Sequence, residues 1–316
     1  MDFPQLASCR ICPRDCGVNR YTGTGFCGAG SNIKIDLAAL HHGEEPPISG
    51  TKGSGTIFFS YCNLRCVFCQ NYTISTGGKG YELSCEELAK LMLKLQEQQA
   101  HNINLVTPTH FSPQIAESLR IAKEAGLELP IVWNSSAYEC LDTLESLDGL
   151  IDIYLPDLKY AHGIYAGKYS SAADYPQVAL AAIKAMYKQS GTLQTDEQGF
   201  ATRGTIVRLL VLPHGLSGAQ TSLHRLAEEL GTEITLSLMG QYYPAGKASL
   251  HKELQRGITE QEYQAVVDTA IQLGFTSVFV QELSCSDAWT PDFIGNNEAH
   301  SDPPIACVNP IMENCL

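Results

Sequence analysis

Two patterns of apolar residues alternate along the chain from residue 56 onwards. Short runs of consecutive apolar residues are typical of parallel strands buried on both faces. Segments with an apolar residue every three or four positions are typical of amphipathic helices. The alternation predicts right-handed crossovers and a parallel sheet or barrel. The predicted strands are residues 56–61, 103–107, 130–134, 150–155, 205–212, 233–238 and 277–281.

Helix-start signals lie between several of these strands. Ser112 followed by Pro113 predicts a helix with the serine as its N-cap and the proline at its first position. Two pairs with the spacing of a capping box predict two further helices, namely Ser84 with Glu87 and Thr259 with Glu262.

One stretch interrupts the alternation. Residues 159–204 contain a single clear helical pattern, at 177–189, and the rest reads as loop. Loops of this length at the carboxyl edge of a barrel are usually functional. We therefore expect three parts, which are a cysteine-rich extension at 1–55, a barrel at 56–283, and a loop-rich tail packed on the barrel at 284–316.

Composition and charge narrow the class of protein. Hydrophobic residues make up 44% of the chain, which suits a packed core, and the net charge is −13. This charge excludes a global attraction to nucleic acid or to anionic membranes. The sequence contains no run of about 18 apolar residues, and its first ten residues lack a signal-peptide pattern. We expect a soluble, cytoplasmic protein.

The chain contains twelve cysteines. Without an export signal, we expect thiols or metal ligands instead of disulfides. Seven of the twelve fall within the first 70 residues, which predicts metal binding at the front of the chain. Those near the end are too spread to predict a site, and we expect ordinary thiols at Cys285, Cys307 and Cys315.

The second group of cysteines directly follows the first predicted barrel strand. Cys62, Cys66 and Cys69 have the spacing C-x3-C-x2-C. Three thiolates bind three irons of a [4Fe–4S] cluster and leave the fourth iron open for another ligand. The alternatives are a zinc site, which would normally need a fourth nearby ligand, and three incidental core thiols.

This motif resembles that of the radical S-adenosylmethionine (SAM) superfamily, in which an aromatic residue, here Phe68, precedes the last cysteine. The segments CVFCQN (66–71) and IYLPDLKY (153–160) look like the branch that contains the pyruvate formate-lyase activating enzyme. Over nearly its full length the chain is most similar to the PflX-like group, through CRICPRDCGVNR (9–20), HHGEEPPISG (41–50) and LMGQYYPA (238–245).

The resemblance implies a partial (β/α)6 parallel barrel, a [4Fe–4S] cluster and SAM. It also implies a reducing electron donor such as flavodoxin or ferredoxin. The expected reaction is reductive cleavage of SAM, after which a 5′-deoxyadenosyl radical abstracts a hydrogen atom. The substrate is either a glycine on a partner protein, which needs an open barrel side, or a small molecule or peptide, which needs a closed pocket.

Four further residues match cofactor positions of the activating enzymes, and a fifth is a candidate contact. Lys159 matches the lysine that meets the SAM carboxylate, and a point charge there is physically sensible. Asp157, Asn134 and Ser135 match positions that hold a small cation beside the same carboxylate. Gln241, at the end of the sixth strand, is expected to contact cofactor or substrate. All five follow or end strands, where barrel sites are built.

The chain departs from this family after the second strand. The usual Gly-Gly-Glu-Pro run, which binds the SAM amino group, is replaced by VTPTH (106–110), so Thr107, Thr109 and His110 are the candidates to replace that contact. A second feature is Arg208, which lies in mid-strand. If it points into the barrel, it needs an anionic partner, because an unpaired buried charge is costly.

The first group of cysteines places four sulfurs close together in sequence. Zinc would stabilise a segment that is otherwise too short for a core, and an auxiliary iron–sulfur cluster would relay electrons or touch substrate. The spacing fits both, with a small preference for the structural metal. The four residues are Cys9, Cys12, Cys16 and Cys27.

The sequence leaves two functional classes open. The first is a radical enzyme, for which no catalytic residue beyond the cofactor contacts is assigned. The second is a metal-binding or redox-sensing protein without turnover, which the missing Gly-Gly-Glu run supports.

Overall fold

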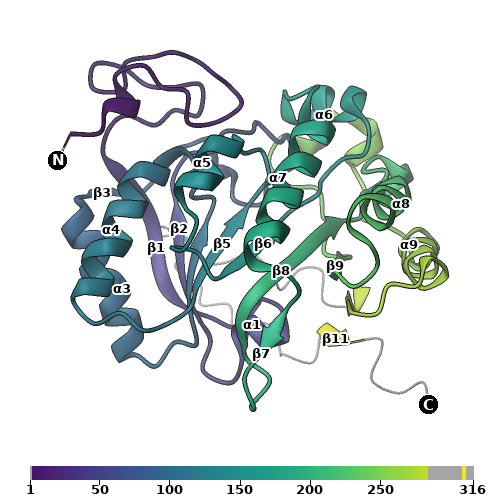
Figure 1. The fold of residues 1–316 in the computed structure, drawn as a ribbon. Coiled ribbons are helices and arrows are strands. Elements are labelled where there is room, and N and C mark those ends of the chain that lie inside the picture. Colours follow the sequence, from purple (N-terminus) through teal and green to yellow (C-terminus); the bar gives the residue numbers. More distant parts are fainter. Residues whose placement is uncertain (1, 284–307, 311–316) are drawn as a thin grey trace, which may run out of the picture.

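An eleven-stranded, mostly parallel sheet organises the chain (Figure 1). This computed structural model describes residues 2–283 and 308–310. The strand order is β11-β10-β9-β8-β6-β5-β4-β2-β1-β3, with β7 beside β8. The strands are β1 (Ile33–His41), β2 (Ser54–Phe59), β3 (Tyr81–Leu83), β4 (Ile103–Val106), β5 (Ile131–Ser135), β6 (Ile153–Pro156), β7 (Gln194–Thr195), β8 (Ala201–Leu210), β9 (Thr235–Met239), β10 (Val278–Gln281) and β11 (Val308–Pro310).

Each of the seven predicted strands is present, as β2, β4, β5, β6, β8, β9 and β10, and neighbours among them pair in parallel. The predicted α/β partial barrel is therefore confirmed, with β10 as a seventh parallel strand. Near-continuous apolar runs identified these strands because both faces of a parallel sheet are covered.

Helices cover the outside of the sheet (Figure 1). Neighbouring helices pack in pairs, α3 on α4, α5 on α7 and α8 on α9. The helices are α1 (Pro46–Ser49), α2 (Tyr72–Ser75), α3 (Cys85–Glu97), α4 (Ser112–Glu124), α5 (Leu141–Ser146), α6 (Gly163–Ser170), α7 (Tyr175–Ser190), α8 (Ala219–Leu230) and α9 (Glu260–Leu273). The 3-10 turns are η1 (Pro4–Leu6), η2 (Thr109–Phe111), η3 (Pro213–Gly215), η4 (Ala248–Leu250) and η5 (Lys252–Leu254).

Two of the three predicted helix starts are confirmed. Ser84 and Thr259 each accept a hydrogen bond from the backbone of the glutamate three residues later, and that glutamate accepts one in return. The prediction for Ser112 is wrong, because η2 leads directly into α4. The helix therefore begins at Ser112 itself, and no side chain caps it.

The prediction of loop before the helix at 177–189 is wrong for α6. Its sequence contains two glycines, which lower helix propensity. Ala166 and Tyr169 are nevertheless buried in the main core. Tertiary packing on one face of α6 therefore stabilises a helix that its local sequence disfavours.

The cysteine-rich extension contributes directly to the barrel. Its strand β1 pairs antiparallel with β2, and α1 follows across the lower end of the sheet in Figure 1. Ile48 of α1 is fully buried and packs in a cluster with Ile153, Leu155 and Ile206. Since those residues belong to barrel strands, Ile48 helps to close the barrel at that end.

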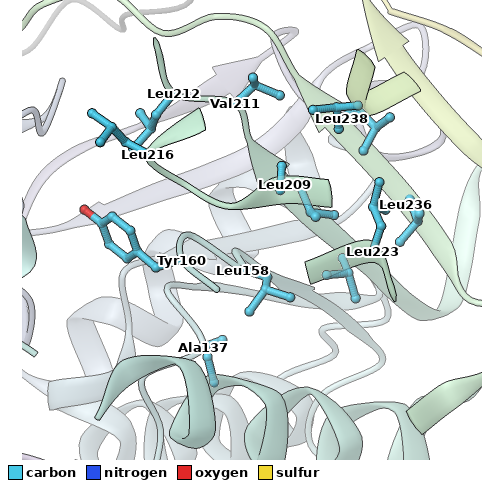
Figure 2. Packing of buried hydrophobic residues seen from close by; sticks show 14 of the residues in the cluster. Ala137, Leu158, Tyr160, Leu209, Val211, Leu212, Leu216, Leu223, Leu236 and Leu238 are labelled. Atoms are coloured by element: carbon cyan, nitrogen blue, oxygen red, sulfur yellow. The ribbon is translucent and has the colours of Figure 1, made fainter. Parts of the chain in front are cut away.

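The main core lies between β8, β9 and the helices beside them. Figure 2 shows Leu209, Leu236 and Leu238 of the two strands facing Leu223 of α8. The same cluster contains Leu64 and Phe68, which belong to the loop that carries the second cysteine group. That loop is therefore anchored by burial of its apolar side chains.

The C-terminal part is described only at β11, which pairs antiparallel with β10. The predicted loop-rich tail otherwise lies outside the described residues, as do the three thiols at Cys285, Cys307 and Cys315. In the part of the chain that the structure describes, no helix has the length and apolar character needed to cross a membrane.

Candidate functional site

The thiols of Cys62, Cys66 and Cys69 line one pocket at the carboxyl ends of the barrel strands, with a cavity volume of about 220 Å³. Two neighbouring segments hold the loop between them. The backbone N–H of Val67 donates to the carbonyl of Tyr169 at 2.8 Å, and the carbonyl of Val67 accepts from the N–H of Lys247 at 2.7 Å. The three thiols are therefore held in one place by backbone hydrogen bonds as well as by the core.

The protonation of these thiols is governed by burial. Burial raises the pKa of Cys62, Cys66 and Cys69 above the ordinary thiol value, in the case of Cys66 to about 11. Hydroxyl groups are close to two of the sulfurs, since Ser170 Oγ donates to Cys66 Sγ at 2.9 Å and Ser75 Oγ lies 3.2 Å from Cys69 Sγ. A metal that binds here therefore displaces protons.

The three thiols line the same pocket. Among residues 2–283 and 308–310, no group of three or more His, Cys, Asp and Glu side chains could hold a metal ion between them. A cubane cluster presents a separate iron to each thiolate, so its ligands need to enclose a space. The donor set and its shared pocket fit such a cluster.

An ion pair faces the thiols across the pocket. Lys159 Nζ donates to Asp157 Oδ2 at 2.5 Å, and both residues line the pocket. Burial opposes the charged form of Lys159, but the negative charge of Asp157 outweighs it and raises the pKa of the amine. Tyr175 fixes the segment, because its hydroxyl donates to the Asp157 carbonyl and accepts from the Lys159 N–H. Lys159 is therefore a fixed cation.

The remaining predicted site residues line the same pocket. Asn134 and Ser135 end β5 and are buried. Phe68 packs edge-on against Tyr242, with ring centroids 5.8 Å apart. Gln241 follows β9, and its side-chain oxygen accepts from Gln281 Nε2 at 2.9 Å. Residues from distant parts of the sequence thus converge on one space.

The candidates to replace the Gly-Gly-Glu contact separate into two groups. Thr107 lines the pocket and has a positive φ of 60°. Thr109 instead donates to Glu139 Oε1 at 2.7 Å, and His110 Nε2 donates to the Ser60 carbonyl at 2.7 Å. Thr109 and His110 are both buried. Only Thr107 of the three is available to a molecule in the pocket.

The base of the pocket contains a buried group of one arginine and two glutamates, of which the sequence analysis predicted only the arginine. Arg208 donates to both Glu44 and Glu45, with 2.8 Å from Nε to Glu45 Oε1. This confirms the expectation that Arg208 has an anionic partner. Glu44 also accepts from Asn104 Nδ2 at 2.7 Å. The signal for Glu44 was the acidic pair before the prolines at 46–47, but no strand pattern linked it to Arg208.

The first cysteine group also comes together in space. Cys9, Cys12 and Cys27 are buried, and Cys16 is half-buried. A Cβ atom built on Gly25 would lie 3.3 Å from Cys27 Sγ and 3.5 Å from Cys16 Sγ, so that the two sulfurs flank this glycine.

Two further side chains from the described residues join this group. Arg20 is fully buried and places Nη1 3.9 Å from Cys9 Sγ, which brings a positive charge to the thiols. Cys140, which follows β5, lies with its Sγ 3.9 Å from the Arg10 carbonyl. Cys140 contributes to raising the pKa of Cys12, after burial and the charges of Cys27 and Cys9. No sequence pattern pointed to this fifth thiol, because it is distant along the chain.

Two arginines join the two cysteine groups. Arg14 lies between Cys12 and Cys16, and its Nε donates to the Asn63 carbonyl at 2.7 Å. Arg65 precedes Cys66, and its guanidinium donates to the Phe26 carbonyl and lies over the Phe26 ring. The extension is therefore in direct contact with the loop that carries the second cysteine group.

Part of the barrel is similar to a known protein family. Residues 56–192 match the family model of the Radical SAM superfamily. This segment is therefore similar to a radical SAM domain. It contains the cysteine triplet, Asn134, Ser135, Asp157 and Lys159. The family implies a [4Fe–4S] cluster and SAM, and the three thiols of the pocket fit the first of these.

A relative of the whole chain is the uncharacterized protein MJ0674 of Methanocaldococcus jannaschii. It is 29% identical over 272 residues, which cover 83% of this chain and 74% of the relative. This similarity extends beyond residues 56–192.

Two solved structures are also similar to part of this chain. The FeFe-hydrogenase maturase HydG from Carboxydothermus hydrogenoformans matches with a TM-score of 0.49 and 13% identity, over 69% of this chain and 50% of HydG. Methylornithine synthase (PylB) matches with a TM-score of 0.48 and 14% identity, over 69% of this chain and 60% of PylB. The present chain thus spans about half the length of HydG.

Proposed function

We propose that this protein is a radical SAM enzyme that cleaves SAM reductively and abstracts a hydrogen atom from a substrate. One observation carries the proposal, namely that three thiols in C-x3-C-x2-C spacing share a pocket with the fixed ion pair of Lys159 and Asp157. When bound, the cluster supplies the electron that breaks the sulfonium bond of SAM.

The residues of the pocket have separate tasks in this proposal. Cys62, Cys66 and Cys69 hold the cluster. Lys159 is a buried cation that faces the SAM carboxylate, and Asp157 keeps it charged and oriented. Asn134, Ser135 and Gln241 supply amide and hydroxyl groups that position SAM or a cation beside its carboxylate. Phe68 shapes the cluster loop by its packing on Tyr242.

The closed base of the pocket supports a small molecule or short peptide as the substrate. Ile48 fills the barrel beneath it, and Glu44, Glu45 and Arg208 form a buried group with one excess negative charge. An excess charge at low exposure favours a ligand that donates hydrogen bonds or carries a cation.

A second proposal is activation of a glycyl radical enzyme, as in the PflX-like resemblance. Its support is the segment 153–160, in which the lysine and aspartate of the activating-enzyme pattern form the ion pair of the pocket. A glycyl-radical signal in an added polypeptide would favour this reaction, and a deoxyadenosine yield that depends on a small molecule would favour the first.

The experiment uses anaerobically purified protein with a reconstituted cluster. After dithionite and SAM are added, 5′-deoxyadenosine is quantified together with iron, sulfide and zinc. We expect nucleoside from the wild type and none from Cys66→Ala. The matched control is Cys85→Ala, since Cys85 is buried on α3 and does not line the pocket.

A second readout is the electron paramagnetic resonance signal of the reduced cluster with and without SAM. No nucleoside and no change in this signal, from a protein that holds four irons, would contradict the enzyme proposal. That result would instead favour a metal-binding or redox-sensing protein.

A further inference from the structure

The buried group at the base of the pocket contains two carboxylates and one cation. Arg208 binds Glu45 through two nitrogens, with 2.8 Å from Nε to Oε1 and 2.6 Å from Nη2 to Oε2. This fork geometry matches one guanidinium to one carboxylate. Glu44 shares only Nη2 of the same arginine. Arg208 and Glu45 therefore compensate each other, and the excess negative charge of the group lies on Glu44.

Of the two glutamates in this group, Glu44 is the one that lines the pocket. Only 8% of its side chain is exposed. Its Oε1 accepts a hydrogen bond from Asn104 Nδ2 at 2.7 Å, and its Oε2 accepts one from Arg208. Asn134, which also lines the pocket, directs its Nδ2 toward the same Oε1 at 3.5 Å. The carboxylate is therefore held in place where a ligand of the pocket can meet it.

A second and independent feature of this place is an unpaired acceptor. Asn104 lies on β4 and is fully buried. Its Oδ1 has no hydrogen-bond partner among the described residues, although its Nδ2 is bonded to Glu44. Exchanging the two amide atoms would place the oxygen against the carboxylate, so the bond to Glu44 fixes the orientation of the amide. A buried acceptor without a donor is costly, and this one lies beside the excess charge of Glu44.

The cofactors that the matched family implies do not compensate Glu44. A [4Fe–4S]²⁺ core held by three thiolates carries one net negative charge. SAM carries one net positive charge, because it has a sulfonium, an ammonium and a carboxylate group. Lys159 and Asp157 compensate each other in their ion pair. With both cofactors bound, the carboxylate of Glu44 therefore still lacks a cation, which the substrate can supply.

The walls of the pocket include apolar side chains from four strands. Phe58 of β2, Val106 of β4, Leu210 of β8 and Met239 of β9 line it together with Glu44. A charged group at the base and apolar walls orient an elongated ligand, with its polar end at the base and its carbon chain along the walls. A hydrocarbon chain that ends in an ammonium group matches both features.

We propose that Glu44 is a specificity-determining residue that binds the ammonium group of a substrate with a hydrocarbon chain, and that Asn104 Oδ1 accepts a second hydrogen bond from the same group. The inference rests on the proposed function, because it names the substrate class of that site. An ammonium group has three N–H donors and a positive charge, so it satisfies the carboxylate and the amide oxygen together. A hydroxyl group has one donor and no charge.

The test uses n-pentylammonium as the probe and 1-pentanol as its uncharged analogue. Each is titrated calorimetrically into protein that holds its cluster and SAM, without a reductant, so that SAM stays intact and occupies its own site. We expect the wild type to bind pentylammonium roughly tenfold or more tightly than pentanol. Pentyltrimethylammonium keeps the charge but has no N–H donor, and we expect it to bind more weakly than pentylammonium because it leaves Asn104 Oδ1 unpaired.

The variant Glu44→Gln removes the charge and keeps the size of the side chain. We expect it to abolish the preference for pentylammonium over pentanol, while its affinity for SAM stays unchanged and shows that the pocket is intact. The matched control is Glu229→Gln on α8, which removes one negative charge from an exposed ion pair and is expected to keep the preference.

Equal affinities of the wild type for pentylammonium and pentanol would overturn the proposal and make a buried water the partner of Asn104 Oδ1. An unchanged preference in Glu44→Gln would also overturn it, as would loss of SAM binding in a folded Glu44→Gln protein, which would make Glu44 a cofactor contact. These titrations need neither an electron nor a hydrogen abstraction. A wild type that prefers pentylammonium but forms no 5′-deoxyadenosine would therefore count against the proposed function alone.

Discussion

Arg14 of the cysteine-rich extension donates a hydrogen bond to the backbone carbonyl of Asn63, the residue that follows Cys62, with 2.7 Å between Nε and O. The same guanidinium also donates to the carbonyls of Ser170 and Ser171, at the end of α6. Asn63 in turn donates through Nδ2 to the Tyr138 carbonyl at 2.6 Å. One side chain thus connects the first cysteine group to the loop of the second.

Loss of this connection is expected to impair the site formed by the cysteine triplet. Arg14→Ala removes charge-assisted hydrogen bonds that contribute about 1.5–3 kcal/mol. We expect lower iron content after reconstitution and slower nucleoside formation. The control is Arg10→Ala, because Arg10 pairs with Asp15 at the surface with 68% of its side chain exposed. Equal activity in the two variants would show that the contact has no role in the site.

The buried group at the base of the pocket predicts a large effect on stability. Arg208→Met leaves two carboxylates, Glu44 and Glu45, buried without their cation. We expect the free energy of unfolding to fall by about 3–5 kcal/mol, measured by urea denaturation. Lys184→Met, which breaks an exposed pair with Glu229, is expected to cost about 0–1 kcal/mol. A small loss for Arg208→Met would mean that water or another cation reaches the carboxylates.

We predict that the first cysteine group binds a metal of its own, which requires its thiols to rearrange, because among the described residues no three such side chains are already placed around an ion. Burial raises the pKa of the Cys12 thiol to about 12, so without a metal this side chain stays protonated at neutral pH. Cys12→Ser is expected to remove either one zinc or four irons per chain, while the iron of the triplet remains. Elemental analysis beside a Cys85→Ser control checks this. Unchanged metal content in Cys12→Ser would exclude a site there.

His110 predicts a loss of stability in acid. Burial lowers the pKa of its imidazole to about 3, from an ordinary value of 6.5. Between these values the unfolded chain binds a proton that the folded chain does not, so stability falls as the pH falls, by up to about 1.4 kcal/mol per pH unit. We expect His110→Gln to reduce this slope in urea denaturation between pH 6 and pH 4. His224→Gln, at an exposed position on α8, is expected to leave it unchanged. Equal slopes in both variants would contradict the prediction.

Much of the fold follows from local pattern, and its failures have physical causes. The seven parallel strands were predictable because residues buried on both faces leave continuous apolar runs. Ser84 and Thr259 were predictable as caps because their partners are three residues away. The prediction of Ser112 as an N-cap was wrong because the turn η2 leads directly into the helix. The prediction of a loop at α6 was wrong because Ala166 and Tyr169 are stabilised by packing against residues that are distant in the sequence.

The candidate site likewise contains residues that local sequence predicted and residues that it did not. The thiol triplet is contained in eight consecutive residues, and Asp157 and Lys159 follow directly on a recognisable strand, so their chemistry was readable from spacing and resemblance. The roles of Glu44 and Cys140 could not be predicted, because their partners Arg208 and Arg10 are distant in the sequence and no local pattern links them.

The sequence by itself determined the parallel barrel, the thiol triplet at its carboxyl edge and the lysine and aspartate that face it, because strand burial and ligand spacing are local properties. Only the tertiary structure decided that Ile48 and Glu44 close the base of the pocket and that Arg14 joins the two cysteine groups. These relations depend on how separate segments pack, and packing is settled by the burial and pairing of residues that are far apart in the chain.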